Sequence, residues 1–196
     1  MRRTHYRRGK RLIDLTAAGL GLVLLAPVLV LLAGAVRWTM GSPVLFRQAR
    51  PGVDGRLFDL IKFRTMTEGP GDDGVRLTPF GSWLRATSLD ELPELWNVVR
   101  GEMSLVGPRP LLTEYLPLYD TRQARRHEVR PGITGLAQVS GRNALDWPER
   151  LELDVSYVER LSARLDIEIL WMTVRSVIRR EGINEDGVAT MTRFGS

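Results

Sequence analysis

The first pattern along the chain is a long apolar run near the N-terminus. From Leu15 to Val36 there are 22 residues without a formal charge. A straight helix of that length would measure about 33 Å, which is enough to span the hydrocarbon core of a bilayer. Six Lys and Arg residues within positions 1–11 precede the run. The pattern predicts a membrane-associated helix with a basic leader.

Three interpretations of this run compete: a cleaved signal peptide, a spanning anchor, and a helix that enters the membrane and turns back. The run is longer than the apolar region of a signal peptide, which is roughly 7–15 residues. A spanning anchor would leave the leader in the cytoplasm and residues 37–196 outside, and sequence physics alone slightly favours it. However, Arg37 makes the second flank basic too, and Pro27 removes a backbone hydrogen bond near the middle. Broken there, each half would be roughly 15–20 Å long, about one leaflet deep.

Downstream of the run, the apolar positions predict a small mixed domain. Residues 44–48 and 57–63 read as short strands, and the turn-rich RPGVDG between them predicts a β-hairpin. Apolar residues then recur at helical spacing over three segments, 111–127, 148–165 and 166–181. On the last of these, core packing is the expected role of Trp171, with lipid contact as the alternative.

Basic side chains gather at two places in this domain. Lys62 and Arg64 flank Phe63 on the second strand and share a face, so they could reach a diphosphate or simply be solvated. A second cluster suits either an anionic membrane surface or a solvated helix end. It comprises Arg122, Arg125, Arg126, His127 and Arg130.

The stretch from 85 to 110 carries an acidic pair, Asp90 and Glu91, before an apolar stripe at helical spacing. Ser88 and Glu91 have the spacing of a capping box, and Pro93 is tolerated only in a first turn, so the helix is expected to start near 88–90. A carboxylate there faces the positive end of the helix and stays ionised. An ionised Asp is a competent nucleophile for phosphorus. The alternative is that the pair merely caps the helix.

Two arginines flank this stretch. Arg85 precedes the acidic pair, and Arg109 lies between two prolines in MSLVGPRP, on a stiff backbone. Two arginines beside a carboxylate could bind a phosphate, or could form an ordinary ion pair with it. Farther along, PGITG at 131–135 is bracketed by glycines and could point several backbone N–H groups at one anion. As a bare pentapeptide it would be only a turn.

Composition narrows the classes of function. The chain of 196 residues is long enough for one domain with a real core. It has no cysteine, which rules out disulfides and thiolate metal sites, and two histidines, which make a histidine-rich zinc site implausible. The net charge of +5 comes from the leader, since the rest has 22 basic and 23 acidic residues. A basic nucleic-acid-binding surface is therefore not expected.

Four ordered motifs resemble one known family. They are RPGVDGRLFDLIKFRTM at 50–66, SLDELPELWNV at 88–98, GEMSLVGPRP at 101–110 and RPGITGLAQVSGRN at 130–143. Together they are similar to the bacterial sugar transferases, the monotopic phosphoglycosyl transferases. The resemblance extends from about residue 10 to about residue 182.

The resemblance implies a fold and a domain organisation. The fold class is α/β and mostly helical, with a re-entrant membrane helix-break-helix joined to a small globular domain that has a β-hairpin and amphipathic interface helices. The expected division is 1–40 for leader and membrane helix, 41–182 for the catalytic domain and 183–196 for a tail. The break is expected at Ala26 and Pro27, although many relatives carry Ser before this proline. The expected location is the cytoplasmic face of the bacterial inner membrane.

The resemblance also implies an activity. The chain would transfer a sugar 1-phosphate from a nucleotide diphosphate-sugar, expected to be a UDP-sugar, to polyprenyl phosphate, as the first membrane step of glycoconjugate assembly. Asp90 would attack the sugar-linked phosphate and form an aspartyl-phosphosugar, which polyprenyl phosphate then attacks. Glu91 would act as a base or orient Mg²⁺, the expected cofactor, with Asp90 and Glu91 as its ligands. The alternatives are a membrane-anchored scaffold without catalysis and a Mg²⁺-dependent phosphohydrolase that uses the same Asp.

The remaining site residues follow from matching positions. Asp154 corresponds to a residue that supports the active-site arginine. The expected phosphate- and substrate-binding residues are Arg85, Arg109, Lys62, Arg64, Pro131, Gly132, Ile133, Thr134, Gly135 and Arg142.

Overall fold

The computed structural model describes residues 2–70, 72–141, 145–179 and 194. Its α-helices are α1 (Arg2–Met40), α2 (Asp73–Arg76), α3 (Pro79–Ala86), α4 (Glu94–Arg100), α5 (Leu136–Ser140), α6 (Trp147–Arg160) and α7 (Ala163–Arg179). Its strands are β1 (Leu45–Pro51), β2 (Leu57–Phe63), β3 (Ser104–Val106) and β4 (Gly132–Thr134). Four short 3₁₀ segments lie among the connections of the described residues: η1 (Val53–Gly55), η2 (Leu89–Glu91), η3 (Thr113–Leu118) and η4 (Gln123–Glu128). Segment η2 carries the acidic pair.

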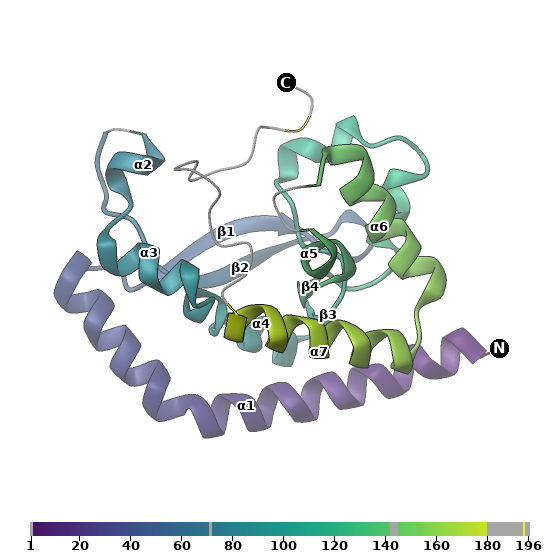
Figure 1. The fold of residues 1–196 in the computed structure, drawn as a ribbon, viewed down its shortest axis with the longest axis horizontal. Coiled ribbons are helices and arrows are strands. Elements are labelled where there is room, and N and C mark those ends of the chain that lie inside the picture. The colour runs from purple at the N-terminus through teal and green to yellow at the C-terminus, as the bar shows by residue number, and fades with distance from the viewer. Residues whose placement is uncertain (1, 71, 142–144, 180–193, 195–196) are drawn as a thin grey trace.

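Helix α1 runs along one side of the globular part and bends partway (Figure 1). Within the described residues it is the one helix long and apolar enough to cross a membrane, over Gly9–Met40, and little of its apolar window is buried. The helix continues through Ala26 and Pro27, so the expected helix-break-helix is instead one bent helix. A proline removes one N–H and crowds the preceding turn, which bends a helix while the flanking hydrogen bonds hold.

The N-terminal part of α1 is docked on the globular domain. Lys10 Nζ lies 2.6 Å from the Asp166 carboxylate at the start of α7. The Arg11 guanidinium donates to the carbonyls of Val98 and Val99 at 2.6 and 3.0 Å, which satisfies the C-terminal carbonyls of α4. The basic leader is therefore attached to the globular domain through Lys10 and Arg11.

The C-terminal end of α1 is attached to the same domain. The Arg64 guanidinium donates to the carbonyls of Met40 and Ser42, just where the helix ends. Val36 is fully buried in a cluster with Phe63 and Leu84. Both ends of the apolar helix thus contact one folded unit.

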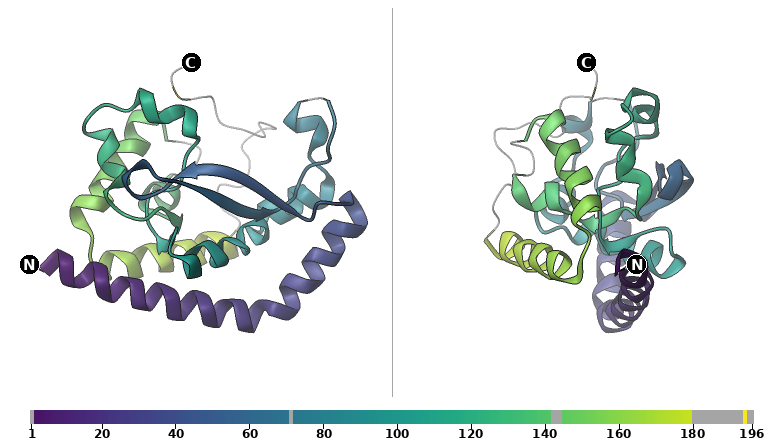
Figure 2. Two further views of the ribbon diagram at one scale, coloured as in Figure 1. Left: turned by 180° about the vertical axis from the view of Figure 1, so that it is seen from behind. Right: turned by 90° about the vertical axis from the view of Figure 1, so that its right-hand side faces the viewer.

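The predicted hairpin is confirmed. Strands β1 and β2 pair antiparallel from Leu45↔Phe63 to Pro51↔Leu57 and form the long ribbon seen from behind in Figure 2. The first strand begins one residue later and ends three residues later than expected, because pairing continues to the turn. In that turn Asp54 adopts a left-handed conformation with φ of 53°.

A parallel pair, β3 and β4, joins two distant segments. A Cβ atom on Gly132 would lie 2.1 Å from the Gly107 nitrogen, and one on Gly135 would lie 2.2 Å from the Gly107 oxygen. Only glycine permits two backbones to approach this closely. The interpretation of 131–135 as a flexible loop is therefore wrong: this segment is a strand with its glycines at a backbone contact.

The helix expected over 111–127 is also wrong, since this segment forms η3 and η4. Pro117 inside η3 cannot donate to a helical hydrogen bond. The basic cluster at its end is not a free cationic surface. Arg125 Nη1 lies 2.6 Å from Glu159 on α6, and Arg122 pairs with Glu152 and Glu159.

Helices α6 and α7 are confirmed, with the junction between them a few residues earlier than expected. Helix α6 packs its apolar side into the core through the fully buried Leu151 and Val155. Helix α7 buries Ile169 but leaves Trp171 69% exposed. The expectation that Trp171 packs in the core is therefore wrong. Helix α7 runs near the N-terminal half of α1 (Figure 1).

Candidate active site

The acidic pair lies in η2, a single 3₁₀ turn ahead of α4. Ser88 precedes it in a left-handed conformation with φ of 55°, and its side chain makes no capping hydrogen bond. Pro93 occupies the N-cap of α4, so the helix begins at Glu94. The expected capping box and helix start at 88–90 are therefore wrong. Asp90 is held by a turn whose direction Pro93 fixes, rather than by the first turn of the helix.

Glu91 gathers the two cations of the site. Its Oε1 accepts from Lys62 Nζ at 2.7 Å and from Arg109 Nη2 at 2.6 Å. Lys62 also lies 3.0 Å from Glu94, which is almost fully buried. Asp90, Glu91, Glu94, Lys62 and Arg109 are called the Asp90 cluster below.

The carboxyls of the Asp90 cluster titrate differently. Burial alone would raise the pKa of Glu91, but Arg109 and Lys62 outweigh it and hold the pKa well below its usual range. Burial raises the pKa of Glu94 to about 7, despite the opposing charge of Lys62. Glu94 was not predicted as a site residue from the sequence, although it lies three residues after Glu91 and so shares its side of the chain.

Asp90 is the group with the properties of a nucleophile. It is only 7% exposed, and its carboxylate accepts no hydrogen bond from the described residues. Burial and then the charge of Glu91 raise its pKa to about 6, while Lys62, Arg109 and Arg85 oppose the rise. With a pKa of about 6, Asp90 is mostly ionised at neutral pH, although less completely than an ordinary aspartate. An ionised carboxylate free of hydrogen bonds retains its nucleophilic lone pairs.

Arg85 and Arg64 have different surroundings. Arg85 Nε donates to the Thr65 hydroxyl at 3.0 Å, and its charge acts on Asp90. Arg64 lies just beyond the end of β2, so it does not share the face of Lys62, and its guanidinium is used at the end of α1. The structure does not bring Arg64 to the Asp90 cluster.

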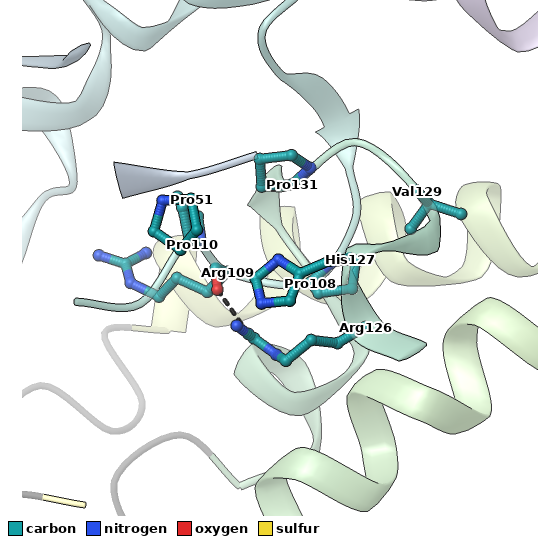
Figure 3. Close-up of a pocket in the computed structure, with 8 residues that line it drawn as sticks. All are labelled: Pro51, Pro108, Arg109, Pro110, Arg126, His127, Val129 and Pro131. Carbon is teal, nitrogen blue, oxygen red and sulfur yellow. Dashed lines mark hydrogen bonds between the residues drawn. The ribbon is translucent and has the colours of Figure 1, made fainter. Parts of the chain in front are cut away.

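The backbone of Arg109 is fixed by a buried ion pair. Arg126 donates to Asp154 through Nε at 3.0 Å and Nη2 at 2.6 Å, and both side chains are nearly inaccessible. Arg126 Nη2 also donates to the Arg109 carbonyl at 2.6 Å (Figure 3). Asp154 therefore supports Arg109 through Arg126, not by direct contact.

Sequence reasoning missed Arg126 as a site residue, because it stood within a basic run. A signal was present in Asp154. It follows Leu151 by three residues on the apolar side of α6, and a carboxylate on a buried side requires a buried cation.

The 131–135 segment contacts the Arg109 loop through its backbone. The Gly132 N–H donates to the Pro108 carbonyl at 3.0 Å, and the Gly107 N–H donates to the Thr134 carbonyl at 2.9 Å. Ile133 packs against the core. The Pro131 carbonyl accepts from Ser104, and the Gly135 carbonyl accepts from Val139. The Gly132 amide is thus already used, and the predicted role of Arg142 lies outside the described residues.

Asp90 and Glu91 fit a Mg²⁺ ion that also binds substrate phosphates. Carboxylate oxygens are hard ligands, and Mg²⁺ is usually bound by one or two carboxylates together with phosphate and water. The described residues contain no group of three acidic or histidine side chains arranged to hold a metal. Glu91 Oε1 is used by Lys62 and Arg109. These residues therefore do not fit a Mg²⁺ site made by protein ligands alone. They fit a site in which substrate phosphates supply some of the ligands.

Comparison with known proteins agrees with this geometry. The family described as bacterial sugar transferase matches residues 5–180. The chain is 52% identical over 191 residues to the uncharacterized sugar transferase EpsL of Bacillus subtilis, covering 94% of this chain and 95% of that one.

Two more distant relatives carry more specific names. The chain is 43% identical over 181 residues to the UDP-glucose:undecaprenyl-phosphate glucose-1-phosphate transferase of Klebsiella pneumoniae, covering 84% of this chain but only 39% of that protein. It is also 43% identical over 187 residues to the protein of the same name from Caulobacter vibrioides, covering 86% and 69% of the two chains. The resemblance noted in the motifs is confirmed: the chain belongs to the bacterial sugar transferase family and is an enzyme of the phosphoglycosyl transferase type.

Proposed function

We propose that this enzyme transfers a sugar 1-phosphate from a UDP-sugar to polyprenyl phosphate through a covalent intermediate on Asp90. The observation that carries the proposal is the state of Asp90: buried, free of hydrogen bonds within the described residues, and surrounded by Lys62, Arg85 and Arg109. The names of the relatives from Klebsiella and Caulobacter give UDP-glucose and undecaprenyl phosphate as their substrates. UDP-glucose is therefore the first donor to test.

The chemistry consists of two displacements at one phosphorus atom. In the first, an Asp90 oxygen forms a bond to the sugar-linked phosphorus. The bond to the bridging oxygen breaks, and its electron pair leaves with the nucleoside monophosphate. In the second, an oxygen of polyprenyl phosphate attacks the same phosphorus, and the bond to Asp90 breaks. The products are polyprenyl diphosphate-sugar and a free Asp90 carboxylate.

The cations of the site offset the charge repulsion in both steps. Lys62 and Arg109 are held by Glu91 at 2.7 and 2.6 Å, so they are oriented before substrate arrives. Because Glu91 keeps a very low pKa, it remains an anion that anchors them, which favours an orienting role over that of a general base. A Mg²⁺ ion bound by Asp90 and Glu91 would supply further charge neutralisation for the diphosphate.

The attachment of α1 supports a monotopic arrangement. Lys10 and Arg11 near its start, and Met40 at its end, are all bonded to the same globular domain. A straight spanning helix would separate these ends by the thickness of the bilayer. A bent helix with both ends held by one domain dips into the membrane and leaves both ends on one face. We place that face at the cytoplasm, where nucleotide-sugars are made.

The site also has to meet two kinds of substrate. The nucleotide-sugar is soluble, whereas the phosphate of the lipid is fixed at the membrane interface. An active site carried by a domain that lies along the embedded helix reaches both. Labelling of cysteines introduced at Ser42 and near the N-terminus in intact inverted vesicles would test this, and opposite accessibility of the two labels would contradict it.

The full chain, purified in detergent or nanodiscs, tests the activity. It is supplied with UDP-glucose, then with a panel of UDP-sugars, with and without undecaprenyl phosphate. Without lipid we expect at most one UMP per enzyme molecule, and with excess lipid we expect continuous formation of UMP and a lipid diphosphate-sugar. Continuous UMP and sugar-phosphate release without lipid would indicate a phosphohydrolase. No turnover across the panel would indicate a scaffold.

A further inference from the structure

Arg50 on β1 faces the Asp90 cluster but has no role in the mechanism above. The register pairs Arg50 with Phe58, Gln48 with Leu60, and Phe46 with Lys62. Paired residues share a face, and so do residues two apart along a strand. Arg50, Gln48 and Lys62 therefore lie on one face of the hairpin.

The guanidinium of Arg50 has only neutral hydrogen-bond partners among the described residues. Nη2 donates to Gln48 Oε1 at 2.6 Å, and Nη1 lies 3.4 Å from the Pro110 carbonyl. Its Nε is buried and has no hydrogen-bond partner within the described part of the chain. Arg126, by contrast, donates two hydrogen bonds to one carboxylate oxygen, Oδ2 of Asp154. A partly buried guanidinium with an unused donor is costly unless a ligand completes it.

A second arginine stands beside it. Burial and then the charge of Arg109 lower the pKa of Arg50 to about 10. Arg50 also contacts the Arg109 loop through the Pro110 carbonyl, and Pro51, the next residue, lines the same small pocket as Arg109 (Figure 3). Two arginines that repel each other across a short gap are the arrangement that binds a phosphate between them.

The contacts indicate which phosphate this subsite would hold. Lys62 and Arg109 both contact Glu91, the residue next to Asp90, whereas Arg50 contacts the Pro110 carbonyl, one residue beyond Arg109. Within the described residues, Arg50 forms no hydrogen bond to a carboxyl of the Asp90 cluster. A phosphate held by Arg109 and Arg50 would therefore be the neighbour of the one that Asp90 attacks.

The geometry of phosphoryl transfer then restricts the occupant. Attacking and leaving oxygens lie roughly in line at phosphorus. The nucleoside monophosphate leaves opposite Asp90 in the first displacement, and the lipid phosphate attacks opposite Asp90 in the second. Both phosphates must therefore use the same place in turn.

We propose that Arg50 and Arg109 form the phosphate subsite opposite Asp90, occupied first by the departing nucleoside monophosphate and then by the attacking polyprenyl phosphate. The proposal rests on the function proposed above, because that function requires two displacements at one phosphorus. It adds Arg50 as a substrate-binding residue and makes the two ligands mutually exclusive.

The test compares Arg50→Gln with Arg47→Gln in the full chain in nanodiscs. Arg47 lies on the same strand but on the opposite face and is exposed, so it is a matched control. Two quantities are measured: the affinity for UMP by calorimetry, and the KM for undecaprenyl phosphate. Because a charge-assisted hydrogen bond to phosphate is lost, we expect Arg50→Gln to weaken both by about tenfold or more. Arg47→Gln should change both by less than about twofold.

Three further measurements keep the outcome decisive. UMP should compete with undecaprenyl phosphate in the wild-type enzyme. Arg50→Lys, which keeps the charge but not the forked donors, should lie between wild type and Arg50→Gln, and thermal unfolding identifies a variant that has not folded. Equal behaviour of Arg50→Gln and Arg47→Gln, or an effect on only one ligand, would overturn the proposal. If the wild type showed no turnover, the proposed function would fail, while UMP affinity would still decide whether Arg50 binds phosphate.

Discussion

Two buried groups of charges, both in contact with Arg109, differ in how completely they are paired. Arg126 and Asp154 form a one-to-one ion pair in which both side chains are nearly inaccessible. In the Asp90 cluster, three carboxyls share Lys62 and Arg109, and two of those carboxyls have a raised pKa. The first group is fully paired, whereas in the second Asp90 forms no ion pair within the described residues.

The difference separates scaffold from chemistry. The fully paired Arg126 and Asp154 fix a backbone position, because Arg126 also donates to the Arg109 carbonyl at 2.6 Å. In the proposed mechanism, the unpaired carboxylate of Asp90 is the group left available to react with a phosphate. Arg109 links the two groups, because its backbone belongs to the first and its guanidinium to the second.

The largest effect is expected from Asp90→Asn. Loss of the nucleophile should lower kcat by about a thousandfold or more. The same substitution should stabilise the fold above pH 7. The raised pKa of Asp90 favours its protonated form in the folded chain, so stability is lost as pH rises from about 4 through about 6. Asn removes that loss, which is worth up to about 3 kcal/mol.

These two effects are measured by turnover and by thermal unfolding at pH 5 and pH 8. Asp73→Asn, an exposed acid on α2, is the control and should change neither quantity. Full activity of Asp90→Asn would contradict this account. So would a variant that is less stable than the wild type at pH 8.

The next effect concerns the fully paired group. Asp154→Asn leaves Arg126 buried without its anion and should cost about 3–5 kcal/mol of unfolding free energy. The double variant Arg126→Met, Asp154→Leu removes both charges and should recover most of that stability. Because the Arg109 carbonyl stays unheld, its activity should remain reduced by about tenfold or more.

Denaturant unfolding and steady-state kinetics of the wild type and the two variants check this prediction. Full recovery of activity in the double variant would mean that Arg126 contributes to folding alone. The Arg126–Asp154 pair would then have no effect on catalysis through Arg109.

The pH dependence distinguishes the Asp90 cluster from an ordinary surface carboxylate. Asp90 must be ionised to attack, and its pKa is about 6. Hence kcat/KM should be half-maximal near pH 6 and fall about tenfold per pH unit below it. A profile flat down to pH 5 would show that Asp90 titrates as a normal aspartate. Thermal unfolding across the same range excludes acid denaturation as the cause.

The smallest effect is expected from exposed ion pairs. Arg125 contacts Glu128 and Glu159 on the surface. Arg125→Ala should change the unfolding free energy by less than about 1 kcal/mol and leave turnover within about twofold, because solvent and salt screen such pairs. A loss comparable to that of Asp154→Asn would show that exposure does not separate these groups.

Local sequence patterns were sufficient for some of these features. The hairpin has alternating residues around a turn-rich hexapeptide, and α6 and α7 have helical spacing over many residues. The acidic pair and Arg109 were found because both stand in short motifs bounded by proline. The 3₁₀ turn that holds Asp90 could not be predicted, because no local sequence pattern indicates that Ser88 adopts a left-handed conformation.

The other misses are contacts between distant segments. The glycines of 131–135 suggested a loop, but they serve a backbone contact with Gly107, some 25 positions earlier in the chain. Arg126 and Arg50 belong to basic runs whose burial depends on α6 and on the Pro110 loop. Arg64 stood one position beyond the end of its strand, so the rule of alternating faces did not apply to it.

The most direct test is mass spectrometry of the full chain after incubation with UDP-glucose, or with another UDP-sugar that proves active, in the absence of lipid. The account predicts a phosphosugar adduct on Asp90 that disappears when undecaprenyl phosphate is added. An adduct on any other side chain, or steady turnover with lipid in an Asp90→Asn enzyme, would contradict it.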